Sequence, residues 1–131
     1  MSDYPERLSR SAEDYLEAIG HLCRKNGQAQ VSDVAAMLNV KKPSVTAAMR
    51  QLAEAGLISY HPYSPAVLTQ KGEQYAADVI NAHNILHRFM KEEAGLSDAR
   101  ADETACLIEH ILTYAEIQAI GERMKKRDSA E

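Results

Sequence analysis

Apolar residues recur at helical spacing along most of this chain, and this pattern predicts a mainly α-helical protein. The first stripe predicts a helix over residues 9–25, which Asn26-Gly27 would end. Its members are Ala12, Tyr15, Leu16, Ile19, Leu22 and Cys23. Because Cys23 lies within the stripe, we interpret it as a small core residue.

Two short helices and a hairpin are predicted next. Ser32 is expected to cap the first helix, a break follows at residues 39–42, and Pro43 or Ser44 opens a second helix that Gly56 ends. Two short strands around a Pro/Ser turn are then predicted in the segment LISYHPYSPAVLT. This order of elements is that of a winged helix, a fold that reads DNA through its second helix.

The second helix turns Val45, Met49 and Leu52 inward and carries small or polar residues on its outer face, as a groove-reading helix needs. The residues that we expect to contact DNA are Ser44, Thr46, Ala47 and Arg50, with Lys41 and Lys42 on phosphates. The net charge of the chain is −4, but residues 28–72 hold four basic and two acidic residues. A mildly basic segment inside an acidic chain permits DNA binding. The alternative is a helical hairpin that only packs inside the protein.

A long helix is predicted from a Thr69 cap to about residue 93. Its apolar stripe consists of Ala76, Val79, Ile80, Leu86 and Met90. His83 and His87 fall inside that stripe, and buried imidazoles need partners for both ring nitrogens. From the spacing alone, these two residues are either hydrogen-bonded core histidines or metal ligands.

The next helix, capped by Ser97 or Asp98, carries the segment CLIEH. Its predicted apolar stripe is Ala105, Ile108, Ile111, Leu112 and Ala115. Cys106, Glu109 and His110 lie at i, i+3 and i+4 and therefore share the opposite face. A thiolate, a carboxylate and an imidazole suit a borderline divalent transition ion better than calcium or magnesium. The alternative is a solvated face with an incidental cysteine.

A last helix is predicted over residues 114–126, with the apolar residues Ile117, Ile120 and Met124. These residues could form a dimer contact or pack on their own domain.

No apolar run reaches membrane-spanning length, and the first ten residues lack the apolar core of a signal peptide. The two cysteines form no CxxC motif, which indicates a reducing compartment. We therefore expect a cytoplasmic protein that does not interact with membranes.

Five segments together resemble the DtxR/MntR family of metal-dependent transcriptional repressors: SAEDYLEAI, VSDVAAMLNVKKPSVTAAMRQLAEAGLI, VLTQKGEQYA, AHNILHRFM and CLIEH. They span nearly the whole chain in the family's order. The resemblance implies a winged helix-turn-helix DNA-binding domain at residues 1–72, followed by a helical metal-binding and dimerisation domain at residues 73–131. By this resemblance we expect a short member of the family, without the SH3-like domain of long members.

The resemblance also implies a set of metal ligands, which are Asp14, Glu17, His83, Cys106, Glu109 and His110. His87 stands where the family often has a carboxylate, and we add it to the set. Asp14 and Glu17 are typical of MntR-like members, whereas Cys106 is typical of iron-type members. The expected cofactor is therefore Mn²⁺ or Fe²⁺, with Zn²⁺, Co²⁺ or Ni²⁺ able to bind in vitro. Seven ligands exceed what one ion normally takes, which indicates two metal ions.

The function implied by the resemblance is repression of metal-uptake genes by a homodimer bound to double-stranded operator DNA. In this hypothesis, a divalent cation offsets the repulsion among Asp14, Glu17 and Glu109 and ties the first helix to the dimerisation helices. The wing departs from the family pattern, because Ser64-Pro65 stands where MntR-like members commonly have Arg-Gly. Its DNA contact is therefore left open.

Three alternatives come from other classes. The first is a winged-helix regulator of an organic ligand or an oxidant, in which the Cys–Glu–His face is incidental. The second is an enzyme with a Cys106–His110 nucleophile pair, for which no orienting third group or oxyanion loop is visible. The third is a structural zinc site. We expect a regulator and not an enzyme.

Overall fold

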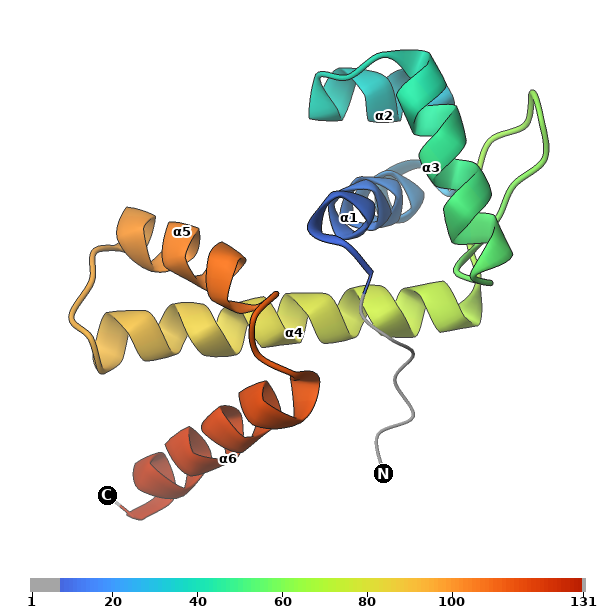
Figure 1. Ribbon diagram of the computed structural model, residues 1–131. Coiled ribbons are helices and arrows are strands. Elements are labelled where there is room, and N and C mark those ends of the chain that lie inside the picture. Colours follow the sequence, from blue (N-terminus) through green and yellow to red (C-terminus); the bar gives the residue numbers. More distant parts are fainter. Residues whose placement is uncertain (1–7, 131) are drawn as a thin grey trace. The chain divides into compact units, whose positions relative to one another are not determined.

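The structure is a computed structural model, and it describes residues 8–130. In order, these residues form α1 (Arg10–Asn26), α2 (Val31–Leu38), α3 (Lys42–Glu54), β1 (Ile58–Ser59), β2 (Val67–Leu68), α4 (Gln70–Glu92), α5 (Asp98–Ile108) and α6 (Tyr114–Ala130) (Figure 1). The predicted mainly helical fold is confirmed. No helix in this part of the chain is long and apolar enough to cross a membrane.

The described residues divide into two compact units, which we call the N-terminal unit (residues 8–77) and the C-terminal unit (residues 78–130). The division falls inside α4, between Ala77 and Asp78. The domain boundary predicted after residue 72 lies near the start of the same helix, and it stays a prediction.

Helix α1 forms because both of its ends are capped and one face is apolar. The Ser9 hydroxyl accepts a hydrogen bond from the backbone N–H of Ala12 at 3.1 Å, which satisfies one of the unpaired N–H groups at the helix start. Gly27 ends the helix at φ 82°, a conformation that glycine adopts without steric cost. Leu16 and Ile19 are buried in the core, as the apolar stripe predicts.

Helices α2 and α3 form the predicted helix-turn-helix. Val45, Met49 and Leu52 of α3 are buried, so the predicted inward face is confirmed. The predicted cap at Ser32 is wrong, because α2 starts at Val31 and its N-cap is Gln30. The physical reason is a contact from outside the helix: Ala29 exchanges two backbone hydrogen bonds of 2.8 Å with a residue of the wing, and this holds the chain extended up to Gln30.

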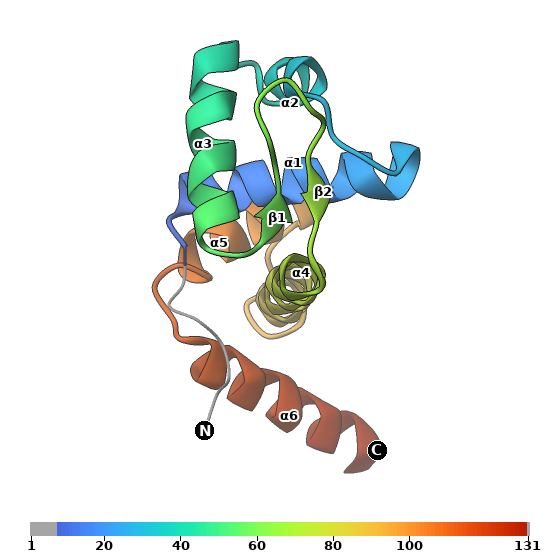
Figure 2. The ribbon, with the colours of Figure 1, turned by 90° about the vertical axis from the view of Figure 1, so that its right-hand side faces the viewer.

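The hairpin after α3 is the wing of a winged helix, as predicted. Its strands pair antiparallel, with Ile58 opposite Leu68 and Ser59 opposite Val67. Figure 2 shows this hairpin beside α3. Ala66 forms the bridge to Ala29, so the wing is also tied to the segment that precedes α2.

The first turns of α4 belong to the N-terminal unit. The Thr69 hydroxyl accepts a hydrogen bond from the Gly72 N–H at 3.0 Å and donates one to the Gly56 carbonyl at 2.6 Å, so the predicted Thr69 cap is confirmed. The Tyr75 hydroxyl donates to a carboxylate oxygen of the buried Glu13 at 2.7 Å. These bonds connect α4 to the turn before the wing and to α1.

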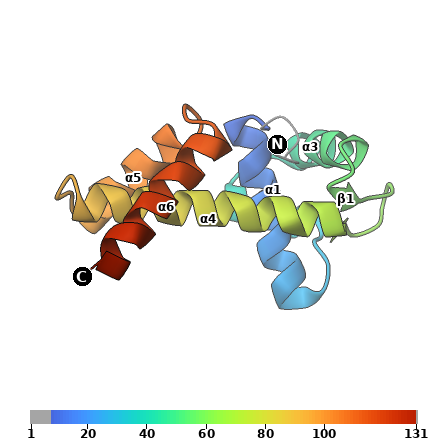
Figure 3. The same ribbon diagram turned by 90° about the horizontal axis from the view of Figure 1, so that it is seen from below.

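The C-terminal unit contains the rest of α4 together with α5 and α6. Its buried apolar residues are Val79, Ala82, Leu86, Ala101, Ala105, Tyr114, Ile117 and Met124. Figure 3 shows α6 crossing α4. A Cβ atom at Gly121 would lie 2.9 Å from Ile85 Cδ1, so glycine at this position permits the close approach of the two helices.

Part of the apolar stripe predicted for the CLIEH helix is wrong. Ala105 is buried, but Ile111 is 78% exposed and Ala115 is also exposed. The reason is that α5 ends at Ile108, so the 3.6-residue period does not continue through the following turn. Glu109, predicted on the outer face, is instead buried at 6% exposure. Ile80, predicted in the buried stripe of α4, is exposed.

Candidate metal centre and nucleic-acid interface

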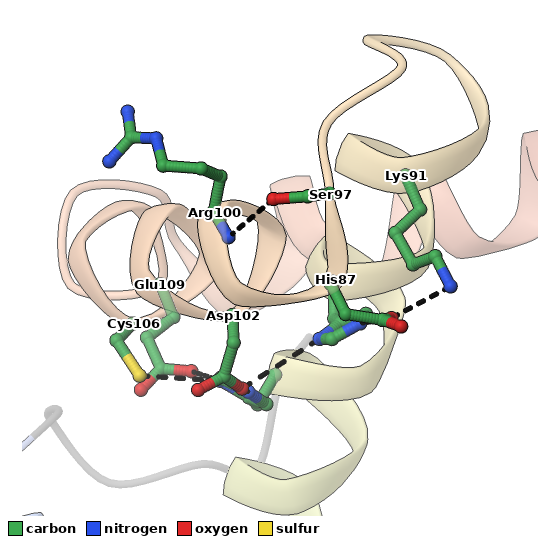
Figure 4. Close-up of polar contacts among 9 residues, drawn as sticks. His87, Lys91, Ser97, Arg100, Asp102, Cys106 and Glu109 are labelled. Carbon is green, nitrogen blue, oxygen red and sulfur yellow. Dashed lines mark hydrogen bonds and ion pairs between the residues drawn. The ribbon is translucent and has the colours of Figure 1, made fainter.

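His83 lies at the centre of a cluster of polar side chains between α4 and α5. Its Nε2 atom is 2.8 Å from Asp102 Oδ1, and its Nδ1 atom is 3.3 Å from Glu109 Oε2 and 3.8 Å from Cys106 Sγ. Figure 4 shows Asp102, Cys106 and Glu109 among these polar contacts, together with His87 of α4. The structure therefore brings together the predicted ligands His83, Cys106 and Glu109.

The cluster has the geometry and the donor set of a transition-metal site. One ligand atom each of His83, Asp102 and Cys106 lie within 4.8 Å of one another. A divalent ion lies about 2.0–2.3 Å from each ligand atom, so its ligands lie about 3–4 Å apart. Here His83 lies 2.8 Å from Asp102 and 3.8 Å from Cys106. Nitrogen, oxygen and sulfur donors together suit Fe²⁺, Mn²⁺ or Zn²⁺. The residues present therefore fit a metal ion.

His87 extends the cluster toward solvent. Its Nε2 atom is 3.4 Å from Asp98 Oδ1, and its Nδ1 atom is 3.7 Å from Asp102 Oδ1. Asp102 thus lies between the two histidines. Asp98 also accepts a hydrogen bond from Lys91 Nζ at 2.7 Å, so a cationic side chain already pairs with the outer carboxylate.

Sequence reasoning missed two members of this arrangement, Asp98 and Asp102. The signal was present, because Asp98, Asp102 and Cys106 recur every four residues and therefore share one face of α5. His83 and His87 have the same spacing on α4. Ser97 fixes the start of α5, since its hydroxyl accepts a hydrogen bond from the Arg100 N–H at 3.3 Å.

The carboxylates hold His83 in its protonated form in the metal-free protein. The hydrogen bond to Glu109 is the largest cause, and together with Asp102 it raises the pKa of His83 from 6.5 to about 9 against the opposing effect of burial. The hydrogen bond between His83 and Asp102 lowers the pKa of Asp102. The hydrogen bond from Lys91 is the main cause that lowers the pKa of Asp98, and the contact with His87 is the second. A proton on His83 therefore occupies the position that a metal ion would take.

One ring nitrogen of His110 is hydrogen-bonded to the backbone. Its Nδ1 atom is 3.2 Å from the carbonyl oxygen of Cys106, which can only accept, so Nδ1 carries the proton. In the neutral ring, Nε2 then keeps the lone pair that a metal ligand needs. This tautomer agrees with the prediction that His110 is a ligand, which stays a prediction.

Asp14 and Glu17 belong to the N-terminal unit, where both are exposed on α1 and away from the buried Leu16 and Ile19. Their assignment as ligands rests on the family resemblance and stays a prediction.

The predicted DNA-contacting residues lie on the surface of the N-terminal unit. Lys41, Lys42, Ser44, Ala47 and Arg50 are exposed, and Thr46 is half-buried. A hollow of about 610 Å³ lies between α3 and the wing, and Lys42, Thr46 and Arg50 line its helical side. This face has the form expected of the predicted interface, and its contact with DNA stays a prediction.

Two sequence models of domain families match the chain. The iron dependent repressor N-terminal DNA binding domain matches residues 7–66, and the iron dependent repressor metal binding and dimerisation domain matches residues 69–130. The chain belongs to the DtxR/MntR family of metal-dependent transcriptional repressors. The His83 cluster lies in the metal binding and dimerisation domain of this repressor family, and the helix-turn-helix lies in its DNA-binding domain.

Two relatives and one solved structure are similar to this chain over most of their length. An uncharacterized HTH-type transcriptional regulator of Methanocaldococcus jannaschii is 35% identical over 107 residues, which are 81% of this chain and 86% of the relative. The HTH-type transcriptional regulator MntR of Shouchella clausii is 36% identical over 112 residues, 86% of this chain and 78% of the relative. A hypothetical protein of Sulfolobus solfataricus has the same fold, with a TM-score of 0.78 at 21% identity over 91% of both chains.

Proposed function

We propose that this repressor binds operator DNA as a homodimer when Mn²⁺ or Fe²⁺ occupies the His83 cluster, and that it controls metal-uptake genes. The observation that carries the proposal is the cluster itself, in which an imidazole, a thiol and two carboxylates converge between α4 and α5. The chain that carries these groups also has a winged-helix unit, so the same molecule combines a ligand site with a DNA-binding fold.

The residues that would hold the metal are those of the cluster and those implied by the family. In this proposal they are Asp14, Glu17, His83, His87, Asp102, Cys106, Glu109 and His110. A bound divalent cation supplies positive charge that offsets the repulsion among these carboxylates. His83 must lose its proton before its nitrogen can serve as a ligand, and Cys106 must be a thiolate.

Ligands from both units would make DNA binding depend on metal. α1 packs against α2 and α3, so a constraint on Asp14 and Glu17 is transmitted to the helix-turn-helix. Coordination of a metal ion by Asp14 or Glu17 would therefore couple metal binding to the helix-turn-helix. A dimer needs that constraint, because its two recognition helices must match half-sites about 34–36 Å apart or a multiple of that distance.

Apolar residues on the surface of the C-terminal unit support the homodimer. Leu107 is 51% exposed at the end of α5, and Ile111 in the following turn is more exposed still. Large aliphatic side chains at adjacent exposed positions are typical of surfaces that a partner covers. A second copy of this chain is the partner that we propose.

The donor set limits the metal without deciding between Mn²⁺ and Fe²⁺. Cys106 favours Fe²⁺, since sulfur is a softer ligand, whereas the carboxylates Asp102 and Glu109 suit Mn²⁺. Zn²⁺ would bind most tightly of the three by the general order of affinities, so metal supply in the cell must contribute to selectivity.

The proposal is tested by fluorescence anisotropy with labelled DNA from the protein's own promoter. The chelated protein is titrated anaerobically, without metal and with Mn²⁺ or Fe²⁺. We expect tight binding only with metal. Equal binding in both states would contradict metal gating and favour a regulator of an organic ligand or an oxidant. Unfolding of the chelated protein would indicate a structural zinc site instead.

Members of this family are transcriptional regulators, which supports a role other than catalysis.

A further inference from the structure

The tip of the wing has a strained backbone. The Ser64 N–H donates a hydrogen bond to the His61 carbonyl at 3.0 Å, which closes a four-residue turn with Pro62 and Tyr63 at its centre. Tyr63 has φ 66°. Proline followed by a residue of positive φ is typical of a type II turn, whose third position is normally glycine or asparagine. A tyrosine there carries a steric cost that glycine avoids.

No packing contact of the Tyr63 ring within the described fold offsets that steric cost. The relative exposure of Tyr63 is 106%, so its ring buries no surface in the N-terminal unit. A large aromatic side chain that is both strained and fully exposed is a local conflict of the kind that is retained at functional sites. The side chain is therefore expected to gain its contacts from a partner.

The surroundings of Tyr63 identify the class of that partner. Tyr63 lines the hollow between α3 and the wing together with Lys42, Thr46 and Arg50. None of the residues that line this hollow is acidic. Two cations and a hydroxyl beside a concave surface suit the sugar-phosphate backbone of DNA, to which most protein–DNA hydrogen bonds are made.

The wing itself contributes no lysine or arginine. Residues 58–68 include no lysine, arginine, aspartate or glutamate. A wing of this composition can contact DNA through neutral groups, and Tyr63 is a fully exposed one at its tip. A tyrosine ring can pack on deoxyribose at the edge of the minor groove, and its hydroxyl can donate to a phosphate or to a base acceptor.

We propose that Tyr63 is the DNA-contacting residue of the wing and that it binds the minor-groove edge of the duplex by neutral packing. This inference rests on the proposed function, since it assigns a further residue to the same DNA-binding surface. It assigns a DNA contact to the wing, which the departure at Ser64-Pro65 had left open. The cations of α3 remain the groups that neutralise phosphates.

The test compares metal-loaded wild-type protein with Tyr63→Gly and Tyr63→Ala, using labelled promoter DNA at several salt concentrations. Both variants should lose DNA affinity by about fivefold or more, as expected for truncation of an aromatic side chain that packs in an interface. The dependence of affinity on salt should not change, because no phosphate charge is neutralised by this residue. Tyr63→Gly alone should raise the melting temperature, by about 2–5 °C, because it removes the strain.

The two variants separate the ring from the backbone, since alanine removes the ring and keeps most of the strain. If wild-type protein binds DNA and Tyr63→Gly binds equally well, the inference is wrong and the proposed function stands. A lower salt dependence in either variant would also overturn the inference, because it would indicate a lost ionic contact. Absence of DNA binding by wild-type protein with every metal tested would overturn both.

Discussion

Two regions differ in how their polar groups are satisfied: the predicted recognition surface, formed by α3 and the wing of the N-terminal unit, and the His83 cluster of the C-terminal unit. On α3, Ser44, Ala47 and Arg50 are exposed to solvent. In the cluster, both nitrogens of His83 already have carboxylate partners, at 2.8 and 3.3 Å. DNA would displace water and counter-ions from the first surface, whereas a metal ion must displace a proton and break internal hydrogen bonds at the second.

This difference indicates where control resides. The recognition surface consists of a regular helix and a paired hairpin, and neither needs a ligand to form. The cluster is held together without metal by a protonated histidine between two carboxylates. We therefore propose that the cluster is the region that changes state with metal supply.

The largest effect is expected from His83→Ala. This variant removes the residue that contacts Asp102, Glu109 and Cys106 at once, so Mn²⁺ affinity should fall by about a hundredfold or more. Calorimetric titration of Mn²⁺ measures the effect. The control is His21→Ala, which removes an exposed histidine of α1 in the other unit. A His83→Ala protein that binds Mn²⁺ like wild type would refute the cluster as the metal site.

Arg50→Ala tests the predicted recognition surface of the N-terminal unit. It should weaken binding to all DNA sequences about equally and lower the slope of log affinity against log salt by about one, because one phosphate contact is lost. Mn²⁺ affinity in the absence of DNA should be unchanged. Arg100→Ala is the matched control, since Arg100 is an exposed arginine of the C-terminal unit. An unchanged DNA affinity would show that α3 is misassigned as the recognition helix.

The proton on His83 gives the cluster a pH dependence. Its folded pKa of about 9 exceeds 6.5, so the pairing with carboxylates stabilises the metal-free fold fully below pH 6.5, and this contribution disappears as pH rises through about 9. Release of the His83 proton alone should change metal affinity in the opposite direction, with a rise of up to about tenfold per pH unit over that interval.

NMR titration of the metal-free protein measures the pKa of His83 directly. Asp102→Asn should lower it part of the way, because Glu109 remains the stronger cause. Asp98→Asn is the control, since Asp98 contacts His87 and not His83. A titration midpoint near 6.5 in wild type would contradict the pairing seen in the cluster.

The smallest effect is expected from Lys91→Met. The Lys91 ammonium competes with a cation for Asp98, so its removal should raise metal affinity at the His87 end of the cluster. The gain should be less than about fivefold, because ion pairs between exposed side chains contribute little. Calorimetry against Lys126→Met, an exposed lysine of α6, shows whether the gain is specific to position 91. A loss of metal affinity would mean that Lys91 supports the site.

Much of the fold was predictable because it follows from local patterns. The stripe of α1, the inward face of α3 and the Thr69 cap depend on residues close in sequence, and all are confirmed. The start of α2 was not predictable, because it depends on the bridge between Ala29 and Ala66. The exposure of Ile111 depends on where α5 ends, which the apolar period alone does not show.

The candidate site was predictable only in part for a similar reason. Spacing identified Cys106, Glu109 and His83 as possible ligands, since each lies on a helix with other ligand types. It did not identify Asp102, because an aspartate on a helix is usually solvated. Only the packing of α5 against α4 shows that Asp102 lies 2.8 Å from His83 and 3.7 Å from His87.

The central claim, that metal in the cluster controls DNA binding, is tested most directly by thermodynamic reciprocity. Calorimetric titration of Mn²⁺ or Fe²⁺ into the protein, with and without saturating operator DNA, gives two metal affinities. The account predicts that DNA raises the metal affinity by the same factor by which metal raises the DNA affinity. Equal metal affinities with and without DNA would contradict it.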